Sequence, residues 1–238
     1  HVFCTMDQIE AEFTYIMNMI KKMYQTFNMQ FKAQLSFRDE TNNYLGDPKL
    51  WEDSQRIIEE VAKKLDLEYE IAKGEAAFYG PKIDIMVTDA LGRKWQCATE
   101  QLDFVQPGRL NLEYTDVDGS SKTPVMIHKA LLGSIERFMA VYIEHTAGKF
   151  PVWVAPEQVR VCTINQTKEV VAYAVSIIKK AESVGIRLEL DDSAESVGKK
   201  IRTAELLKIP YTVVIGQHEI ESGKVTPRIR GDITVHEP

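Results

Sequence analysis

The sequence predicts an α+β fold, with an antiparallel sheet domain flanked by helices over residues 1–151 and a smaller α/β domain with a mixed sheet over 152–238. Three observations lead to this prediction. The first part combines long helical patterns with a hairpin whose residues alternate between apolar and polar. A segment with two prolines and a glycine, 148–156, is typical of a domain boundary. Beyond it strand and helix patterns alternate, which implies βαβ crossovers and parallel strands.

Two helices are expected near the start of the first domain. A Thr-x-x-Gln capping box at 5–8 precedes apolar residues repeated at helical spacing over 9–27. An Asp-Pro pair at 47–48 places a cap and a proline where a helix can begin, and an apolar stripe follows over 50–65.

Alternation then indicates strands. Residues 82–88 alternate between apolar and polar, 89–92 read as a turn, and 95–99 alternate again, which together predict an antiparallel hairpin with one polar face. We expect a further strand over 110–114 and a helix from His128 to about Thr146.

The second domain is expected to alternate regularly. Its predicted elements are a strand at 158–164, a helix at 167–183, a strand at 186–190, a helix at 196–208, a strand at 211–215, and a hairpin turning around 221–223 with its return strand at 225–230.

Composition excludes several protein classes. Hydrophobic residues make up 44% and charged residues 27%, which suits a soluble chain with a core, and no apolar run is long enough for a membrane span. The net charge of −6 argues against a general polyanion binder, so we expect neither DNA nor a membrane as partner. Residues 199–230, however, hold seven basic side chains against three acidic ones, which indicates a local polyanion contact, although on charge alone an ordinary solvated surface is the preferred interpretation.

Cysteine usage points to a reducing, cytoplasmic environment. The three cysteines are far apart in the sequence, odd in number and include no C-x-x-C pair, so a disulfide framework is not expected. The chain begins with His1 and shows no signal-peptide pattern, and we interpret it as a piece of a longer protein.

Polar side chains gather around the predicted hairpin. Tyr79 and Lys82 precede and begin its first strand, and Gln96 and Gln101 follow on its second. Amide, phenol and ammonium groups on a rigid sheet suit a small polar ligand that must be oriented, although an ordinary solvated face has the same composition. The two glutamines are an odd number of residues apart, so regular alternation would put them on opposite faces; a bulge near Thr99–Glu100 would bring them together.

Three further side chains are ambiguous from the residues alone. Arg137 lies among small and apolar residues, so it is expected either to pair with a glutamate or to face an anion. His1 and His128 lack any local metal-binding spacing, and by themselves they read as ordinary core or surface histidines.

Several strings, in order and spacing, resemble the threonyl-tRNA synthetase family. They are "HVFCT", "AFYGPKIDIMV", "QCATEQLDF", "PVMIHKALLGSIERF", "FPVWVAP" and "IPYTVVIGQHEIESGKVTPRIRG". The resemblance runs from His1 to about Arg230, and Gly-Ser-Ile-Glu-Arg-Phe within it matches motif 3 of class II synthetases.

The resemblance implies a class II catalytic domain followed by an anticodon-binding domain. It implies that L-threonine is activated with ATP and Mg²⁺, transferred to threonine tRNA, and that the complete enzyme is a homodimer. It also implies a Zn²⁺ ion held by two histidines, here His1 and His128, and by a cysteine that would lie before His1, because Cys4 does not match it.

Individual residues match functional positions of the family. Tyr79 matches a tyrosine near the substrate's amino group, Gln96 and Gln101 match active-site glutamines, with Gln96 also near ATP, and Lys82 matches a catalytic-cleft lysine. Arg137 matches the motif 3 arginine that grips ATP. Positions that contact the anticodon are matched by Arg202, Lys208, Glu219 and Arg228.

The chain also departs from the family pattern. Motifs 1 and 2 are missing, so the isolated 238-residue chain is expected to be inactive. Residues 191–195 replace a basic stretch that contains an asparagine, and Lys208 stands where an arginine is usual, which keeps the charge but loses the bidentate fork. Two alternatives therefore stay open: another class II synthetase of the prolyl or histidyl type, and a non-catalytic tRNA-binding module derived from a synthetase.

Overall fold

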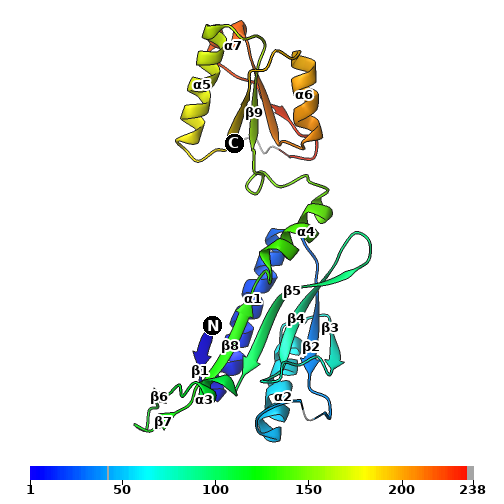
Figure 1. Cartoon of the computed structure of the whole chain (residues 1–238), viewed down its shortest axis with the longest axis vertical. Helices are drawn as coiled ribbons and strands as arrows, with labels where there is room; N and C mark the ends of the chain where they lie inside the picture. Colours follow the sequence, from blue (N-terminus) through cyan, green and yellow to red (C-terminus); the bar gives the residue numbers. More distant parts are fainter. Residues whose placement is uncertain (42, 235–238) are drawn as a thin grey trace. The chain divides into compact units, whose positions relative to one another are not determined.

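The computed structural model describes residues 1–41 and 43–234 and divides into two compact units, His1–His145 and Thr146–Pro238. The sequence predicts that the first domain ends at residue 151, and the division lies a few residues before that position. Each unit has its own sheet (Figure 1). In the described part of the chain no helix has the length and apolar character needed to cross a membrane. Cys4, Cys97 and Cys162 are buried free thiols.

The first unit is built on a six-stranded sheet with the order β1-β8-β5-β4-β2-β3. Neighbouring strands are antiparallel except β2 and β3, which run parallel because α2 crosses over between them. The strands are β1 (Val2–Cys4), β2 (Lys32–Phe37), β3 (Tyr69–Lys73), β4 (Lys82–Thr88), β5 (Lys94–Asp103) and β8 (Val125–Ala130).

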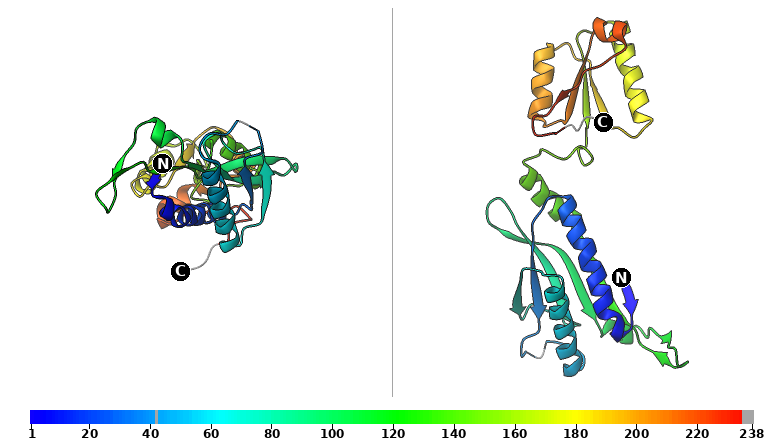
Figure 2. Two further views of the ribbon diagram at one scale, coloured as in Figure 1. Left: turned by 90° about the horizontal axis from the view of Figure 1, so that it is seen from below. Right: turned by 180° about the vertical axis from the view of Figure 1, so that it is seen from behind.

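Two long helices lie on the same side of this sheet (Figure 2, right). A capping box formed by Thr5 and Gln8 precedes a short 3₁₀ turn, η1 (Met6–Gln8), which leads into α1 (Ile9–Thr26). The Asp47 side chain accepts a hydrogen bond from the main-chain N–H of Lys49 and caps α2 (Pro48–Lys64). Both helices confirm the sequence prediction. The apolar face of α1 is fully buried and consists of Ile9, Phe13, Ile16, Met17, Ile20 and Tyr24.

Two predicted elements of this unit are wrong. In place of a strand at 110–114, a short helix α3 (Gln106–Arg109) ends in a turn, and only a two-stranded ribbon of β6 (Tyr114–Thr115) and β7 (Ser121–Lys122) follows. In place of a helix starting at His128, residues 125–130 form β8, and α4 (Ile135–Thr146) begins later. Pairing of β8 with both β1 and β5 overrides its local helical preference.

The second unit has a four-stranded mixed sheet with the order β10-β9-β11-β12. β9 (Val159–Thr163), β10 (Leu188–Asp191) and β11 (Tyr211–Ile215) are parallel, and β12 (Arg228–Ile229) is antiparallel to β11. The helices α5 (Lys168–Glu182) and α6 (Val197–Leu206) flank the sheet on its two sides (Figure 1). Its core cluster consists of Val161, Val170, Ala174, Val213 and Ile215.

The predicted hairpin around 221–223 is also wrong. Residues 217–222 form a short helix, α7 (Gln217–Ser222), which ends at Gly223 with φ +65°. A left-handed glycine at this position stops a helix. The chain then returns to β12, which is much shorter than the strand predicted over 225–230.

Candidate active site and RNA-binding site

A bulge in β5 brings the two predicted glutamines to one face of the sheet. Ile85 pairs with Ala98 but Met86 pairs with Gln96, so Cys97 is the additional residue. The bulge was expected near Thr99–Glu100 and lies instead at Cys97, which corrects the predicted position. Because the strand gains one residue there, Gln96 shares a face with Gln101 despite their odd spacing.

The predicted site residues converge on a carboxylate that sequence reasoning did not single out. Asp84 is 1% exposed, and its Oδ1 accepts hydrogen bonds from Gln96 Nε2 at 2.7 Å and Thr99 Oγ1 at 2.8 Å. Its Oδ2 accepts from Ser36 Oγ at 2.8 Å and pairs with the Lys82 ammonium. The alternation of polar and apolar residues over 82–88 could have identified Asp84, because it puts this residue on the same face of the strand as Lys82.

Tyr79 and Gln101 extend this cluster. Gln101 Nε2 donates to Thr99 Oγ1 at 3.3 Å, and the Tyr79 hydroxyl donates to Gln101 Oε1. Gly80 makes this approach possible, because a Cβ there would lie 1.9 Å from the Leu102 carbonyl oxygen. Burial, with a smaller contribution from nearby carboxylates, raises the pKa of Tyr79, so the phenol keeps its proton at neutral pH.

Arg137 lies beside the same strand. Its Nη1 donates to the main-chain carbonyl of Gln96 at 2.9 Å, and in the described part of the chain no glutamate pairs with it. Gly133, with φ +61°, precedes α4, and a Cβ there would lie 3.0 Å from the Cys97 carbonyl oxygen. The exposed guanidinium lines a cavity of about 310 Å³, so the arrangement leaves it able to meet an anion.

His1 and His128 lie next to each other, and His128 also lies next to Tyr79. The two imidazole rings are 4.8 Å apart between centroids, and the Tyr79 ring lies 5.3 Å from that of His128. His128 Nε2 is 2.9 Å from Oδ2 of the buried Asp103. This arrangement is that of a metal-ligating histidine oriented by a carboxylate.

The donor set fits part of a zinc site. Adjacent imidazoles are suitable Zn²⁺ ligands, and a zinc ion with three protein ligands needs one more donor. Within residues 1–41 and 43–234 no group of three or more His, Cys, Asp or Glu side chains could hold a metal ion. The two histidines are thus brought together, without a third ligand among the described residues.

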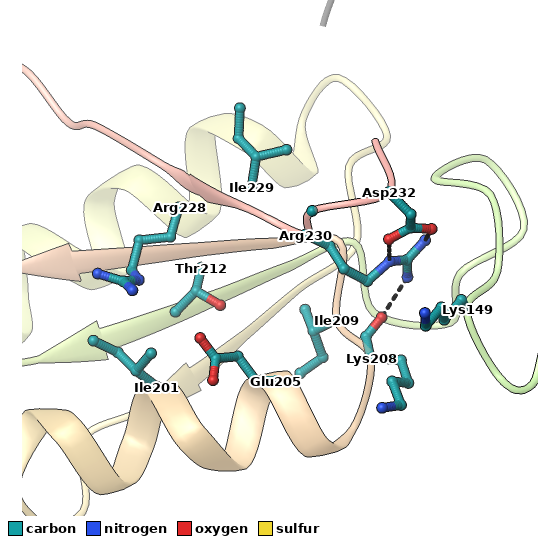
Figure 3. A pocket seen from close by; sticks show the side chains of 11 residues that line it. Lys149, Ile201, Glu205, Lys208, Ile209, Thr212, Arg228, Ile229, Arg230 and Asp232 are labelled. Atoms are coloured by element: carbon teal, nitrogen blue, oxygen red, sulfur yellow. Dashed lines mark hydrogen bonds and ion pairs between the residues drawn. The ribbon is translucent and has the colours of Figure 1, made fainter. Parts of the chain in front are cut away.

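In the second unit, Lys208 and Arg228 line one cavity of about 700 Å³ (Figure 3). Arg228 reaches into it from β12 and Glu205 from α6. Isoleucines form the apolar part of its wall, namely Ile201, Ile209 and Ile229. A cavity with an apolar wall and cations at its rim suits an unstacked base with its phosphates.

Arg230 also lines this cavity, but its donors are used within the unit. It donates to the Lys208 carbonyl at 2.5 Å and to the Phe150 carbonyl at 2.8 Å, and it forms an ion pair with Asp232 at 2.6 Å. Lys208 itself has φ +59°, so Arg230 holds a left-handed residue at the edge of the cavity. Composition alone places Arg230 among the basic residues available to a polyanion, and no local pattern indicates this internal role.

Arg202 and Glu219 lie outside this cavity. Arg202 is exposed on α6. Lys208 precedes β11, whereas Glu219 follows it. The Glu219 carboxylate accepts a hydrogen bond from the main-chain N–H of Gly216 at 2.9 Å. The structure therefore brings together two of the four predicted anticodon residues and places Glu219 beyond the other end of β11.

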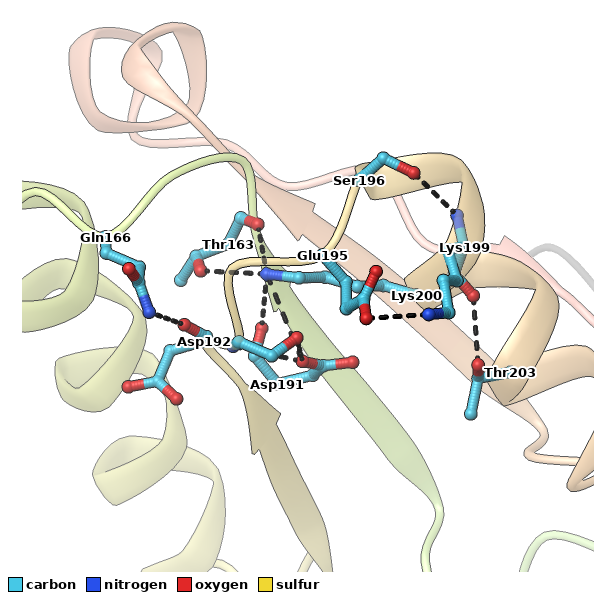
Figure 4. A network of polar contacts seen from close by, with 10 residues as sticks. Thr163, Gln166, Asp191, Asp192, Glu195, Ser196, Lys199, Lys200 and Thr203 are labelled. Atoms are coloured by element: carbon cyan, nitrogen blue, oxygen red, sulfur yellow. Dashed lines mark hydrogen bonds and ion pairs between the residues drawn. The ribbon is translucent and has the colours of Figure 1, made fainter.

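Lys200, another residue counted as basic surface, is buried (Figure 4). Its ammonium donates to the Thr163 carbonyl at 2.8 Å and the Asp191 carbonyl at 3.1 Å. Lys200 thus links the ends of β9 and β10, and Gln166 Nε2, which donates to the Asp192 carbonyl at 2.9 Å, links the loops that follow them. The predicted basic region thus contains fewer available cations than its composition suggests.

Comparisons with known proteins agree with this architecture. The model of the tRNA synthetase class II core domain (G, H, P, S and T) matches residues 1–146, and that of the anticodon binding domain matches residues 158–236. A threonine–tRNA ligase of Gloeobacter violaceus is 46% identical over 233 residues, which cover 97% of this chain and 37% of that protein. A threonine–tRNA ligase of Parabacteroides distasonis is 45% identical over 235 residues, which cover 98% of this chain and 36% of that protein.

A solved structure is also similar. The RNA binding domain of threonyl-tRNA synthetase from Cryptosporidium parvum is 39% identical, with a TM-score of 0.88 over 96% of this chain and 57% of that chain. This chain spans a little over a third of the length of the curated relatives it matches. The chain belongs to the class II tRNA synthetase family, joins that family's core domain to an anticodon-binding domain, and has the threonine–tRNA ligases as its relatives.

Proposed function

We propose that this chain takes part in joining L-threonine to its tRNA, with a substrate cleft in the first unit and anticodon recognition in the second. The observation that carries the proposal is the convergence of Tyr79, Lys82, Gln96 and Gln101 around one buried carboxylate, in a chain similar to threonine–tRNA ligases. Rigid polar groups at one place are what the orientation of a small zwitterionic substrate requires.

The reaction has two steps. The carboxylate of threonine attacks the α-phosphorus of ATP and pyrophosphate leaves; a hydroxyl of the tRNA's terminal ribose then attacks the acyl carbon and AMP leaves. Arg137 binds the triphosphate, and its contact with the Gln96 carbonyl keeps it next to the amino-acid cleft. Lys82 places a positive charge in the same cleft. Mg²⁺ bound with ATP would neutralise part of the phosphate charge.

His1 and His128 would hold a zinc ion together with one further ligand. When bound, Zn²⁺ would act as a Lewis acid that accepts amino and hydroxyl groups as ligands. A substrate without a hydroxyl would supply one ligand fewer. Asp103 fixes the orientation of the His128 ring, and Tyr79 lies against that ring on the substrate side.

The first experiment measures threonine-dependent exchange of pyrophosphate into ATP. The 238-residue chain is expected to show no exchange, and the longer protein that carries it is expected to show exchange that falls in Arg137→Ala. A longer protein without exchange, but with intact tRNA binding, supports the non-catalytic alternative. A preference for proline or histidine supports the other synthetase types.

The second experiment tests anticodon reading. Binding of a threonine anticodon stem-loop and of a non-threonine stem-loop is compared across a salt series for Arg228→Ala and Lys199→Ala. Loss of a base contact costs about 1–3 kcal/mol and relaxes discrimination, whereas loss of a phosphate contact weakens both RNAs and reduces the salt dependence. Arg228→Ala is expected to relax discrimination. Equal weakening of both RNAs would make Arg228 a phosphate contact.

A further inference from the structure

We propose that Asp84 is a positioning residue that sets the direction of the hydrogen bonds along the floor of the cleft. As a result, the cleft presents acceptor atoms and selects a ligand whose primary amino group donates N–H hydrogens to them. The inference rests on the proposed function for the identity of the ligand, but the positioning role of Asp84 rests on geometry alone.

The hydrogen bonds to Asp84 can run in one direction only. A carboxylate accepts hydrogen bonds and donates none. Asp84 is buried, and both of its oxygens are occupied by donors from three strands: Ser36 on β2, Lys82 on β4, and Gln96 and Thr99 on β5. Each of these groups must therefore turn a hydrogen toward Asp84.

One branch of this network contains Gln96 alone. Its amide nitrogen lies 2.7 Å from Asp84 Oδ1, so the amide oxygen must point the other way. Without the carboxylate, the two ends of a glutamine amide are nearly equal in shape and either could face the ligand. Asp84 thus makes Gln96 an acceptor toward the cleft.

The second branch passes through three groups in sequence. Thr99 uses its only hydrogen on Asp84 and can only accept from Gln101 Nε2, at 3.3 Å. The oxygen of Gln101 therefore faces Tyr79 and accepts its hydroxyl hydrogen. Tyr79 has no second hydrogen, so its oxygen offers only a lone pair to a ligand.

Both branches end in acceptors. A primary amino group brings at least two N–H donors and satisfies both, whereas a hydroxyl brings one donor. The ligand class is therefore a primary amine, as in an α-amino acid, in preference to the corresponding α-hydroxy acid.

The test replaces Asp84 by asparagine, which keeps the shape but turns one acceptor into a donor. Asp89→Asn is the matched control. Asp89 is also buried on this hairpin and accepts from Trp95 Nε1 at 2.8 Å and Arg93 Nε at 2.6 Å, but it lies at the turn and contacts none of the residues of the cleft network. Both variants lose a buried carboxylate, so a general loss of stability affects both.

The first readout is the side-chain amide signals of Gln96 and Gln101 in NMR spectra of the chain. Asp84→Asn is expected to shift both, and Asp89→Asn neither. Thr99→Val, which cuts only the longer branch, is expected to shift Gln101 and leave Gln96 unchanged. This variant keeps the test decisive if Asp84→Asn does not fold. Unmoved signals in the folded variants would overturn the positioning role, whatever reaction the protein performs.

The second readout uses pyrophosphate exchange by the longer protein that carries the chain. In Asp84→Asn the KM for L-threonine is expected to rise roughly 2- to 10-fold, because an N–H of the substrate loses its acceptor, with the KM for ATP unchanged. Inhibition by the α-hydroxy analogue of threonine should weaken less. Parallel changes in both KM values, or the same changes in Asp89→Asn, would overturn the selectivity claim. Absence of exchange in the unmodified protein refutes the proposed function and leaves the NMR result to decide the role of Asp84.

Discussion

Asp103 and His128 are joined across neighbouring strands, with His128 Nε2 at 2.9 Å from Asp103 Oδ2. Since a carboxylate only accepts, Nε2 carries the hydrogen and Nδ1 keeps its lone pair. The other oxygen of Asp103 accepts from the main-chain N–H groups of Val105 and Gln106, at 2.9 and 2.8 Å. The same side chain therefore fixes the tautomer of the histidine and the turn that follows β5.

Asp103→Asn should weaken zinc binding. The asparagine can turn its amide N–H₂ toward His128, which favours the tautomer with hydrogen on Nδ1 and removes the lone pair available to a metal. Loss of such an orienting partner typically lowers metal affinity about 10- to 100-fold. Competition with a chromophoric chelator measures the change. His145→Gln serves as control, because His145 Nε2 bonds to the Asn28 carbonyl instead. Unchanged affinity in Asp103→Asn would contradict the assignment of His128.

Glu100 makes stability depend on pH. Its side chain is fully buried, and among the described residues neither of its carboxyl oxygens has a hydrogen-bond partner. Burial raises the pKa of Glu100 well above 4.5, Lys129 opposes the shift, and Glu12 adds to it. The folded state therefore binds a proton that the unfolded state releases at a lower pH. The contribution of Glu100 to the free energy of unfolding is therefore fully present below the ordinary glutamate pKa and is lost as the pH rises through the raised pKa.

Glu100→Gln should flatten this dependence, and Glu100→Leu should stabilise the first unit by roughly 1–3 kcal/mol at pH 8, because no unpaired polar group is left. Urea unfolding at pH 5 and pH 8 measures both effects. Glu75→Gln, at an exposed position, is the control. If the unmodified chain and Glu100→Gln lose stability equally between the two pH values, Glu100 is not the group responsible.

Lys200→Met should destabilise the second unit by about 2–4 kcal/mol. Methionine fills much of the same volume but leaves the Thr163 and Asp191 carbonyls without their donor. Lys199→Met, one residue away, removes an exposed ion pair with Glu195 and should change stability by less than about 1 kcal/mol. Thermal unfolding of both variants gives the comparison. Equal effects would show that the burial of Lys200 contributes nothing of its own.

Substitutions at Lys208 should separate stability from RNA binding. Glycine adopts a φ of +59° without strain, so Lys208→Gly should keep or raise stability, by up to about 1 kcal/mol, while it weakens stem-loop binding. Lys208→Met should weaken binding to a similar extent without any gain in stability. Melting temperature and RNA affinity are measured for both. Full RNA affinity in both variants would remove Lys208 from the RNA-binding surface.

Local patterns predicted the elements whose faces differ in polarity. The helices α1 and α2 each bury one face, so a period of 3.6 residues remains in the sequence. In β4 apolar and polar residues alternate, so a period of 2 remains although Asp84 on the polar face is also buried. The strand β8 lies between two other strands, and its first three residues are all buried, so alternation is lost. The following Lys-Ala-Leu-Leu run then resembles a helix. The strands β2 and β3 left no pattern that predicted them.

The site was predicted in part for a similar reason. Tyr79, Lys82, Gln96 and Gln101 carry recognisable polar groups next to a predicted hairpin. Asp84 belongs to the same face, but its burial depends on Ser36 from the unpredicted strand β2. Charge counting likewise treats each lysine or arginine as exposed. Lys200 and Arg230 turn inward, because main-chain carbonyls from distant segments accept their hydrogen bonds.

The bulge at Cys97 links the two halves of the proposed reaction centre. Deletion of this residue would leave Gln96 and Thr99 on the same face as before, because regular alternation between Gln96, Ala98 and Thr99 gives that arrangement without it. The deletion would remove the carbonyl against which Gly133 packs and shift the Gln96 carbonyl that anchors Arg137. A shortened strand would therefore keep the side chains proposed to bind the amino acid but lose the position of Arg137, which is proposed to bind ATP. In a relative whose two glutamines are four residues apart instead of five, the amino-acid cleft and the ATP-binding arginine would no longer be coupled through this bulge.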